Sequence, residues 1–309
     1  MTLKECLGYE EMILEKLIYF SIFRHPLKVE EIHNLLRGKI TLNQIQWTLN
    51  EGVAKGWLYE NKGFFTVDQE VANWVMERRQ KEEVGIRYFK ALPFWARLIR
   101  CFPFVRGVAV SGSLSKGVIH DNGDIDYFII TTQGRLWLTR TFLVLFKKAF
   151  LLNSRRYFCV NYFISEDHLE IPDHNVFTAT EIEYLIPIYN EDLFRRFREV
   201  NQWVRDYFGE FNHPVRWRSI PRKGRKAKEM LERVFGGSFG DRLDDLFMRL
   251  TLMRWRRKFS HFDHESFDLA LRSKKEVSKH HPQNFQEKVL SKMNEIREKV
   301  EQKRMRVAV

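Results

Sequence analysis

The stretch VSGSLSKGVIHDNGDIDYFIIT, at residues 110–131, constrains the fold of this chain more than any other part of the sequence. Short apolar runs rich in β-branched residues flank its polar middle, at residues 105–110 and 127–132. Runs of this length and composition are typical of buried strands. We therefore expect the loop between them to be anchored at both ends by strands.

Within this loop, glycine and serine stand where a phosphate can approach the backbone. Gly112 permits a tight turn, and Gly117 keeps the return path free of a side chain. Ser113 adds a hydroxyl group and a backbone N–H, and Lys116 adds a positive charge. Successive N–H groups in such a turn bind phosphate oxygens, especially where they begin a helix. The loop is a candidate phosphate site, and a polar turn between strands is the alternative.

Two carboxylates follow the glycines. Asp124 and Asp126 are two residues apart at the start of an expected strand, so both side chains should point to the same face. Converging carboxylates repel each other unless a cation lies between them. Magnesium is held by one or two carboxylates together with substrate phosphates. The sequence therefore predicts a site for Mg²⁺ or Mn²⁺ at this pair.

The whole motif resembles the Gly-Ser, Gly and Asp-x-Asp signature of the DNA polymerase beta-like nucleotidyltransferase superfamily. The matching positions are Gly112, Ser113, Gly117, Asp124 and Asp126. The resemblance covers roughly residues 105–165. It implies metal-dependent transfer of a nucleoside monophosphate from a nucleoside triphosphate to an acceptor, with release of pyrophosphate. It also implies that the two aspartates hold two divalent ions and that Ser113, with the turn at Gly112, binds the β- and γ-phosphates.

The superfamily usually brings a third carboxylate from a later strand, and this chain departs from that pattern. After a helix expected at residues 136–152, the next strand is expected at residues 157–164, with Asn161 at its central position. An amide oxygen can bind a hard cation, but an amide cannot act as a base. Asn161 is therefore predicted as a metal ligand, and catalysis could be slow, rerouted or absent. Glu166 and Asp167 are candidate substitutes, with a solvated turn as the alternative.

The formal net charge of +12 favours polyanionic partners such as nucleotides or nucleic acid. Arg135 and Arg140 follow the aspartates closely enough to add charge to a triphosphate pocket, unless they lie on an ordinary exposed helix face. Two basic segments, residues 213–230 and 254–258, each include a tryptophan. They are candidates for nucleic-acid contact, with a linker and a solvated helix face as the alternative.

Apolar periodicity predicts three helices near the N-terminus, at residues 9–23, at residues 29–36 and after Thr41, which is a candidate N-cap. Two β-rich runs follow at residues 57–59 and 64–67, and the turn between them contains Lys62 and a glycine.

This order resembles the winged helix-turn-helix family, with residues 43–50 as the recognition helix and the hairpin at Lys62 as the wing. The expected recognition helix has no Arg or Lys that could read guanine edges. A module for packing or protein contact is therefore the alternative to DNA binding.

Residues 68–100 are expected to be helical, with Pro93 breaking the pattern into two pieces. Beyond residue 173 the pattern becomes almost entirely helical, and Asn201 and Trp203 are candidates for lining a cleft. The charged helix at residues 285–309 is expected to fray. The histidines at residues 261–265 and 280–281 give no complete set of metal ligands.

Three distant cysteines support neither disulfides nor a thiolate zinc site, which favours a reducing compartment. The best apolar run, at residues 142–152, is interrupted by two lysines and is shorter than the ~20 residues of a membrane-spanning helix. We expect a cytoplasmic protein without a membrane partner, of undetermined oligomeric state.

These observations predict an α+β protein. The expected parts are a winged-helix-like domain at residues 1–67, connecting helices at 68–104, a nucleotidyltransferase core with a mixed sheet and flanking helices at 105–172, and a helical C-terminal region at 173–309. The expected function is a metal-dependent nucleotidyltransferase acting on a nucleoside triphosphate and an unidentified acceptor. The alternative is a catalytically weak or inactive nucleotide-binding module coupled to nucleic-acid binding by the winged helix.

Overall fold

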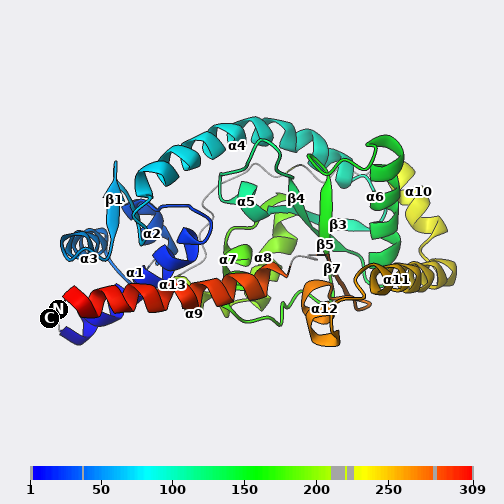
Figure 1. The fold of residues 1–309 in the computed structure, drawn as a ribbon. Helices are drawn as coiled ribbons and strands as arrows, with labels where there is room; N and C mark the ends of the chain where they lie inside the picture. The colour runs from blue at the N-terminus through cyan, green and yellow to red at the C-terminus, as the bar shows by residue number, and fades with distance from the viewer. Residues whose placement is uncertain (1–2, 37, 210–219, 221–225, 281–283, 308–309) are drawn as a thin grey trace.

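The computed structural model describes residues 3–36, 38–209, 220, 226–280 and 284–307. The fold is mixed α+β, with a five-stranded sheet near its centre (Figure 1). The strands lie in the order β6-β3-β4-β5-β7. Their bounds are Val105–Ser111 for β3, Asp126–Thr131 for β4, Cys159–Ser165 for β5, Ile186–Tyr189 for β6 and Val277–Lys279 for β7. Only the β4–β5 pair is parallel, so the sheet is mixed.

The three predicted N-terminal helices and the hairpin are present. They are α1 (Leu3–Ser21), α2 (Val29–Leu35), α3 (Leu42–Ala54), β1 (Tyr59–Asn61) and β2 (Phe64–Thr66). Thr41 caps α3, because its hydroxyl accepts a hydrogen bond from the Gln44 N–H while the Gln44 side chain accepts one from the Thr41 N–H. Leu27 pairs with Phe65, which adds a short third segment to the hairpin.

The predicted break at Pro93 is wrong, because α4 (Val71–Ile99) is one helix that passes through the proline. It extends from the N-terminal helices across the central sheet (Figure 1). Proline lacks an N–H and removes one backbone hydrogen bond from the helix. Leu92 and Ala96, on either side of Pro93, are fully buried in the core shared with the sheet. Tertiary packing therefore holds the helix together where the local signal favours a break.

The central sheet is covered on both faces. Tyr127 and Ile129 of β4 belong to one core cluster, and Phe128 and Ile130 belong to the other. This alternation follows from the period of two along a strand. The parallel pair β4–β5 requires a crossover, which α6 (Leu136–Phe150) provides. The predicted strands at both ends of the Gly-Ser loop are therefore present.

The prediction of an almost entirely helical region beyond residue 173 is wrong in two places. Strands β6 and β7 come from this region and form the two edges of the sheet. The helices are α7 (Val176–Glu183), α8 (Glu191–Val200), α9 (Val204–Tyr207), α10 (Lys226–Val234), α11 (Ser238–Lys258), α12 (His264–Ala270) and α13 (Phe285–Val307). Short apolar runs such as LIPIY cannot be assigned to helix or strand by periodicity alone.

The predicted fraying of the last helix is also wrong. Helix α13 packs against α1, which brings the two ends of the chain side by side (Figure 1). Val289 and Val300 of α13 are buried in the core cluster that also includes residues of α1, and Arg304 donates hydrogen bonds to Glu10 and Glu11. Within the described parts of the chain, no helix has the length and apolar character needed to span a membrane.

Candidate functional site

A glycine with left-handed backbone conformation directly follows β3 and begins the Gly-Ser loop. Gly112 has φ +68°, and a Cβ at this position would lie 2.6 Å from Oδ2 of Asp126. Only glycine allows the backbone to turn so close to this carboxylate. The short helix α5 (Gly112–Ser115) follows, and Gly117, with φ +80°, ends the turn. Ser113 is exposed within α5.

The two aspartates line the same groove, although Asp124 lies just before β4 and only Asp126 is in the strand. Desolvation raises the pKa of Asp126 to about 6, and the negative charges of Asp124 and Glu181 act in the same direction. Hydrogen bonds from Cys159 and Asn161 act in the opposite direction. The two hydrogen bonds to Asp126 therefore only partly offset the cost of burying its negative charge.

Asn161 lies beside Asp126 because of a β-bulge. The register between β4 and β5 shifts after Tyr127 and Val160, which leaves Asn161 as the extra residue. Its Nδ2 donates a hydrogen bond to Oδ1 of Asp126 at 3.0 Å. Its Oδ1 is buried and has no hydrogen-bond partner among the described residues. Asn161 thus lies next to Asp126, in the groove that both aspartates line.

These donors fit a hard divalent cation. Two carboxylates and an unpartnered amide oxygen are ligands that Mg²⁺ accepts, and the remaining positions are usually filled by water and substrate phosphates. No group of three or more His, Cys, Asp or Glu side chains suited to a metal occurs in the described part of the chain. A cation here would therefore depend on Asn161 and on oxygens from a substrate.

Glu181 of α7 also belongs to the site, although no local sequence pattern indicates it. Its Oε1 accepts a hydrogen bond from Nζ of Lys116 at 2.8 Å, and its Oε2 accepts one from the Gly112 N–H at 3.3 Å. The Glu181 carboxylate therefore accepts a hydrogen bond from a backbone N–H of the turn that was expected to bind phosphate. It also pairs with Lys116, the positive charge expected beside this turn. Lys116 and Glu181 are separated by 65 positions in the sequence, which explains why no local pattern reveals this contact.

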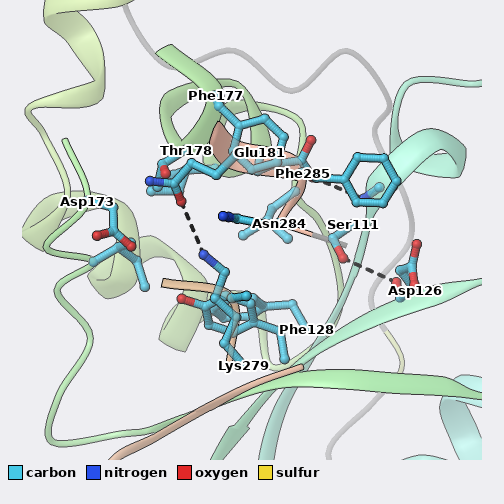
Figure 2. A pocket seen from close by; sticks show the side chains of 17 residues that line it. Ser111, Asp126, Phe128, Asp173, Phe177, Thr178, Glu181, Lys279, Asn284 and Phe285 are labelled. Atoms are coloured by element: carbon cyan, nitrogen blue, oxygen red, sulfur yellow. Dashed lines mark hydrogen bonds between the residues drawn. The ribbon is translucent and has the colours of Figure 1, made fainter. Parts of the chain in front are cut away.

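Two cavities meet at Asp126. One is a groove of about 610 Å³ that contains both aspartates, Asn161 and several basic side chains. The other is a smaller cavity of about 100 Å³ with Ser111, Gly112 and Glu181 in its wall. Figure 2 shows this smaller cavity, with Ser111 and Asp126 at one end and Asp173 at the other. Its remaining wall is largely apolar, and Phe128, Tyr162, Phe177, Ile182 and Leu185 form part of it.

The expected role of Arg135 in a triphosphate pocket is wrong. Arg135 is buried and donates hydrogen bonds to Asp241 and to the carbonyl oxygens of Phe235 and Gly236. It therefore joins α6 to the start of α11. Arg140 does line the groove, where its guanidinium lies 4.7 Å from the ring centre of Trp255, and burial lowers its pKa to about 10.

Glu166 and Asp167 do not replace the missing carboxylate. They follow the far end of β5, at least five residues beyond Asn161, which corresponds to roughly 17 Å along a strand. Asp167 instead accepts a hydrogen bond from Ser165 and pairs with His168 at 3.2 Å. The alternative of a turn is correct for these residues.

Three other aromatic or polar candidates prove to be structural. Asn201 is fully buried, and its Oδ1 accepts a hydrogen bond from the Ile171 N–H at 2.8 Å, so it does not line a cleft. Trp203 stacks on His174 at 4.2 Å, outside both cavities. Trp255 is buried against Trp137, so its ring is not free to stack on a base.

Parts of the basic and histidine-rich segments, including Trp217 and His281, lie outside the described residues. The described groups nevertheless bring together a glycine turn, two carboxylates, an amide oxygen and basic side chains. Such a set can hold a divalent cation together with a polyphosphate. Comparison of the chain with protein families, curated proteins and solved structures finds no match.

Proposed function

We propose that this chain is a metal-dependent nucleotidyltransferase. It would transfer a nucleoside monophosphate from a nucleoside triphosphate to an acceptor and release pyrophosphate. One observation carries the proposal: the Gly112 turn at the end of β3 lies against Asp126 at the start of β4, with Asn161 hydrogen-bonded on the other side. This is the arrangement expected from the resemblance to the DNA polymerase beta-like superfamily.

Asp124, Asp126 and Oδ1 of Asn161 would hold the magnesium. When bound, the metal would neutralise charge on the polyphosphate and on the attacking oxygen. The hydrogen bond from Nδ2 of Asn161 fixes the orientation of the Asp126 carboxylate. Basic side chains in the groove, such as Arg140 and Lys147, would bind the polyphosphate and stabilise the departing pyrophosphate.

Two observations favour a second candidate, a nucleotide-binding module without transferase activity. Asn161 cannot accept a proton, and the carboxylate of Glu181 competes for the Gly112 N–H. In this case the protein would bind a nucleotide with magnesium and release no pyrophosphate. An Asn161→Asp variant that gains transfer where the wild type has none would favour this candidate.

We infer that α1–α3 and the β1–β2 hairpin form a winged-helix module. The order of elements and the pairing of Leu27 with Phe65 support this assignment. On α3, Leu42 is 43% exposed and Trp47 is 52% exposed, and the helix has no Arg or Lys. Exposed apolar side chains on a helix that lacks basic residues favour contact with a protein over reading of duplex DNA.

The test is incubation of the full chain with Mg²⁺ or Mn²⁺ and each of the four nucleoside triphosphates labelled at the α-phosphate. Acceptors are the protein itself, added RNA and small hydroxyl compounds. Pyrophosphate release and label transfer in the wild type, both lost in Asp124→Asn, support the proposal. Unchanged transfer in that variant would rule out the assigned site.

A further inference from the structure

The groove beside Asp124 and Asp126 contains more positive charge than its carboxylates balance. Six basic side chains line it: Arg140, Lys147, Lys148, Arg155, Arg254 and Lys258. Within the described residues, none of the six forms an ion pair with a carboxylate, whereas Lys116, Arg135 and Lys275 each do. Among the described residues of the lining, the two aspartates are the only acidic ones, which leaves a net charge of +4.

The positive charge is spread along the groove and comes from three parts of the fold. Lys147 and Lys148 lie in the last turn of α6, Arg155 precedes β5, and Arg254 and Lys258 lie one turn apart on α11. Residues four apart on a helix share a face. The arrangement therefore suits an extended anion that contacts α6 and α11 together.

A nucleotide alone does not account for this charge. A nucleoside triphosphate with one bound Mg²⁺ carries a charge of about −2, and with two it carries about zero. Either value leaves at least half of the +4 uncompensated. A second polyanion in the same groove would balance it.

Apolar groups lie among the basic ones. Leu145 and Leu250 line the groove and are 53% and 50% exposed, and Phe285 lies where the groove meets the smaller cavity. Single-stranded nucleic acids combine phosphates with flat apolar bases, and proteins bind them with basic grooves and exposed aromatic or apolar side chains.

We propose that the groove binds single-stranded nucleic acid and that a terminal hydroxyl of this strand is the acceptor. This inference rests on the proposed transferase function. The hydroxyl oxygen forms a bond to the α-phosphorus, and the bond from the α-phosphorus to the β-phosphate oxygen breaks. Pyrophosphate leaves with the electron pair, and the hydroxyl proton passes to water because Asn161 cannot accept it.

The test is fluorescence anisotropy of a labelled 20-nucleotide single-stranded RNA, without nucleoside triphosphate, at several salt concentrations. The test variant is Arg254→Glu with Lys258→Glu, and the matched control is Arg256→Glu with Arg257→Glu. All four residues are exposed on α11, but only the first two line the groove. Both variants carry the same change in charge, and thermal unfolding checks that both remain folded.

The wild type should bind the RNA, with affinity falling as salt rises. The groove variant should bind about 10-fold or more weakly, and the slope of log K against log salt should become less steep by about 1.4 for two lost phosphate contacts. The control should stay within about 2-fold of the wild type. The same titration with a single-stranded DNA of the same sequence shows whether the groove binds ribose or deoxyribose strands more tightly.

Two results would overturn the inference: no binding of either strand at low salt, whether or not inorganic polyphosphate binds, or equal weakening of RNA binding in both variants. The transferase proposal is separable from this outcome. Label transfer from the nucleotide without binding of RNA or DNA would leave that proposal intact. Strand binding without any label transfer would support the groove and contradict the transferase.

Discussion

Among single residues, Gly112 makes the clearest prediction, because Gly117 provides a matched control. Both glycines have positive φ, but a Cβ on Gly112 would meet Asp126 whereas a Cβ on Gly117 would meet nothing within 4 Å. Alanine at either position should cost about 1 to 2 kcal/mol of unfolding free energy through backbone strain. Only Gly112→Ala should also weaken magnesium-dependent nucleotide binding, as measured by calorimetry. Equal nucleotide affinity in the two variants would argue against a site at Gly112.

Glu181 gives the second prediction at this scale. Its carboxylate occupies the Gly112 N–H and pairs with Lys116, so an incoming phosphate must displace it. Glu181→Gln keeps the shape of the side chain and removes the negative charge. Nucleotide affinity should rise by about 3-fold or more, because a charged pair is replaced by a weaker neutral contact. A lower affinity in this variant would mean that Glu181 helps to bind the ligand, for instance through its metal.

Single residues also show where sequence reasoning ends. The glycine turn and both aspartates could be predicted from the sequence, because they lie close together between two apolar runs. The bulge that turns Asn161 toward Asp126 depends on the register between two strands, and the sequence alone does not reveal it. Glu181 reaches the site from a distant helix, so no spacing rule could have found it.

Among the secondary-structure elements, β7 brings an unusual buried lysine to the sheet edge. Lys279 is 7% exposed, and its Nζ donates a hydrogen bond to the Gln286 side chain at 3.1 Å. Burial lowers the pKa of Lys279 to about 8, from 10.5. Asp173 acts in the opposite direction but is also bonded to Arg272. The folded protein therefore has to bury a charge at pH 7.

This burial predicts how stability depends on pH. Between about pH 8 and 10.5 the unfolded chain keeps the proton of Lys279 and the folded chain loses it, so this residue's contribution to stability rises with pH. Urea unfolding should show that Lys279→Met stabilises the protein at pH 7.5 and that its advantage shrinks toward pH 9.5. Lys274→Met is the control, because Lys274 is exposed to solvent rather than buried. If the gain in unfolding free energy of Lys279→Met does not change with pH, the pKa of Lys279 is not lowered by burial as described.

The elements differ in how far the sequence predicted them. The N-terminal helices, β3, β4, α6 and β5 carry strong local patterns, and all are present. The short strand β7 has the sequence VSK and pairs with β5, more than 100 residues earlier, so its state is set by tertiary pairing. Helix α4 likewise continues through Pro93 because the surrounding core supports it.

At the scale of the whole molecule, α13 connects the N-terminal helices to the region of the site. Phe285, at its first turn, lines both cavities, and Val300, near its other end, is buried close to α1. Val300→Ala should lower the free energy of unfolding by about 1 to 2 kcal/mol, through lost burial and a new cavity. Met305→Ala is the control, because Met305 is 66% exposed on the same helix. Equal stability of both variants in urea would indicate that α13 is not packed as described.

The proposed transferase function depends on Asp124 and Asp126, the two carboxylates that would hold the metal. The most direct measurement compares transfer of α-labelled phosphate, with Mg²⁺ and a single-stranded RNA acceptor, in the wild type and in Asp124→Asn, Asp126→Asn and Asp121→Asn. Asp121 lies in the same loop, but it is exposed and pairs with Arg87 at 2.7 Å, outside both cavities.

We predict that the first two variants lose transfer by about 100-fold or more while remaining folded, and that Asp121→Asn keeps the wild-type rate. Transfer that survives in both Asp124→Asn and Asp126→Asn, or that is lost equally in Asp121→Asn, would contradict the claim.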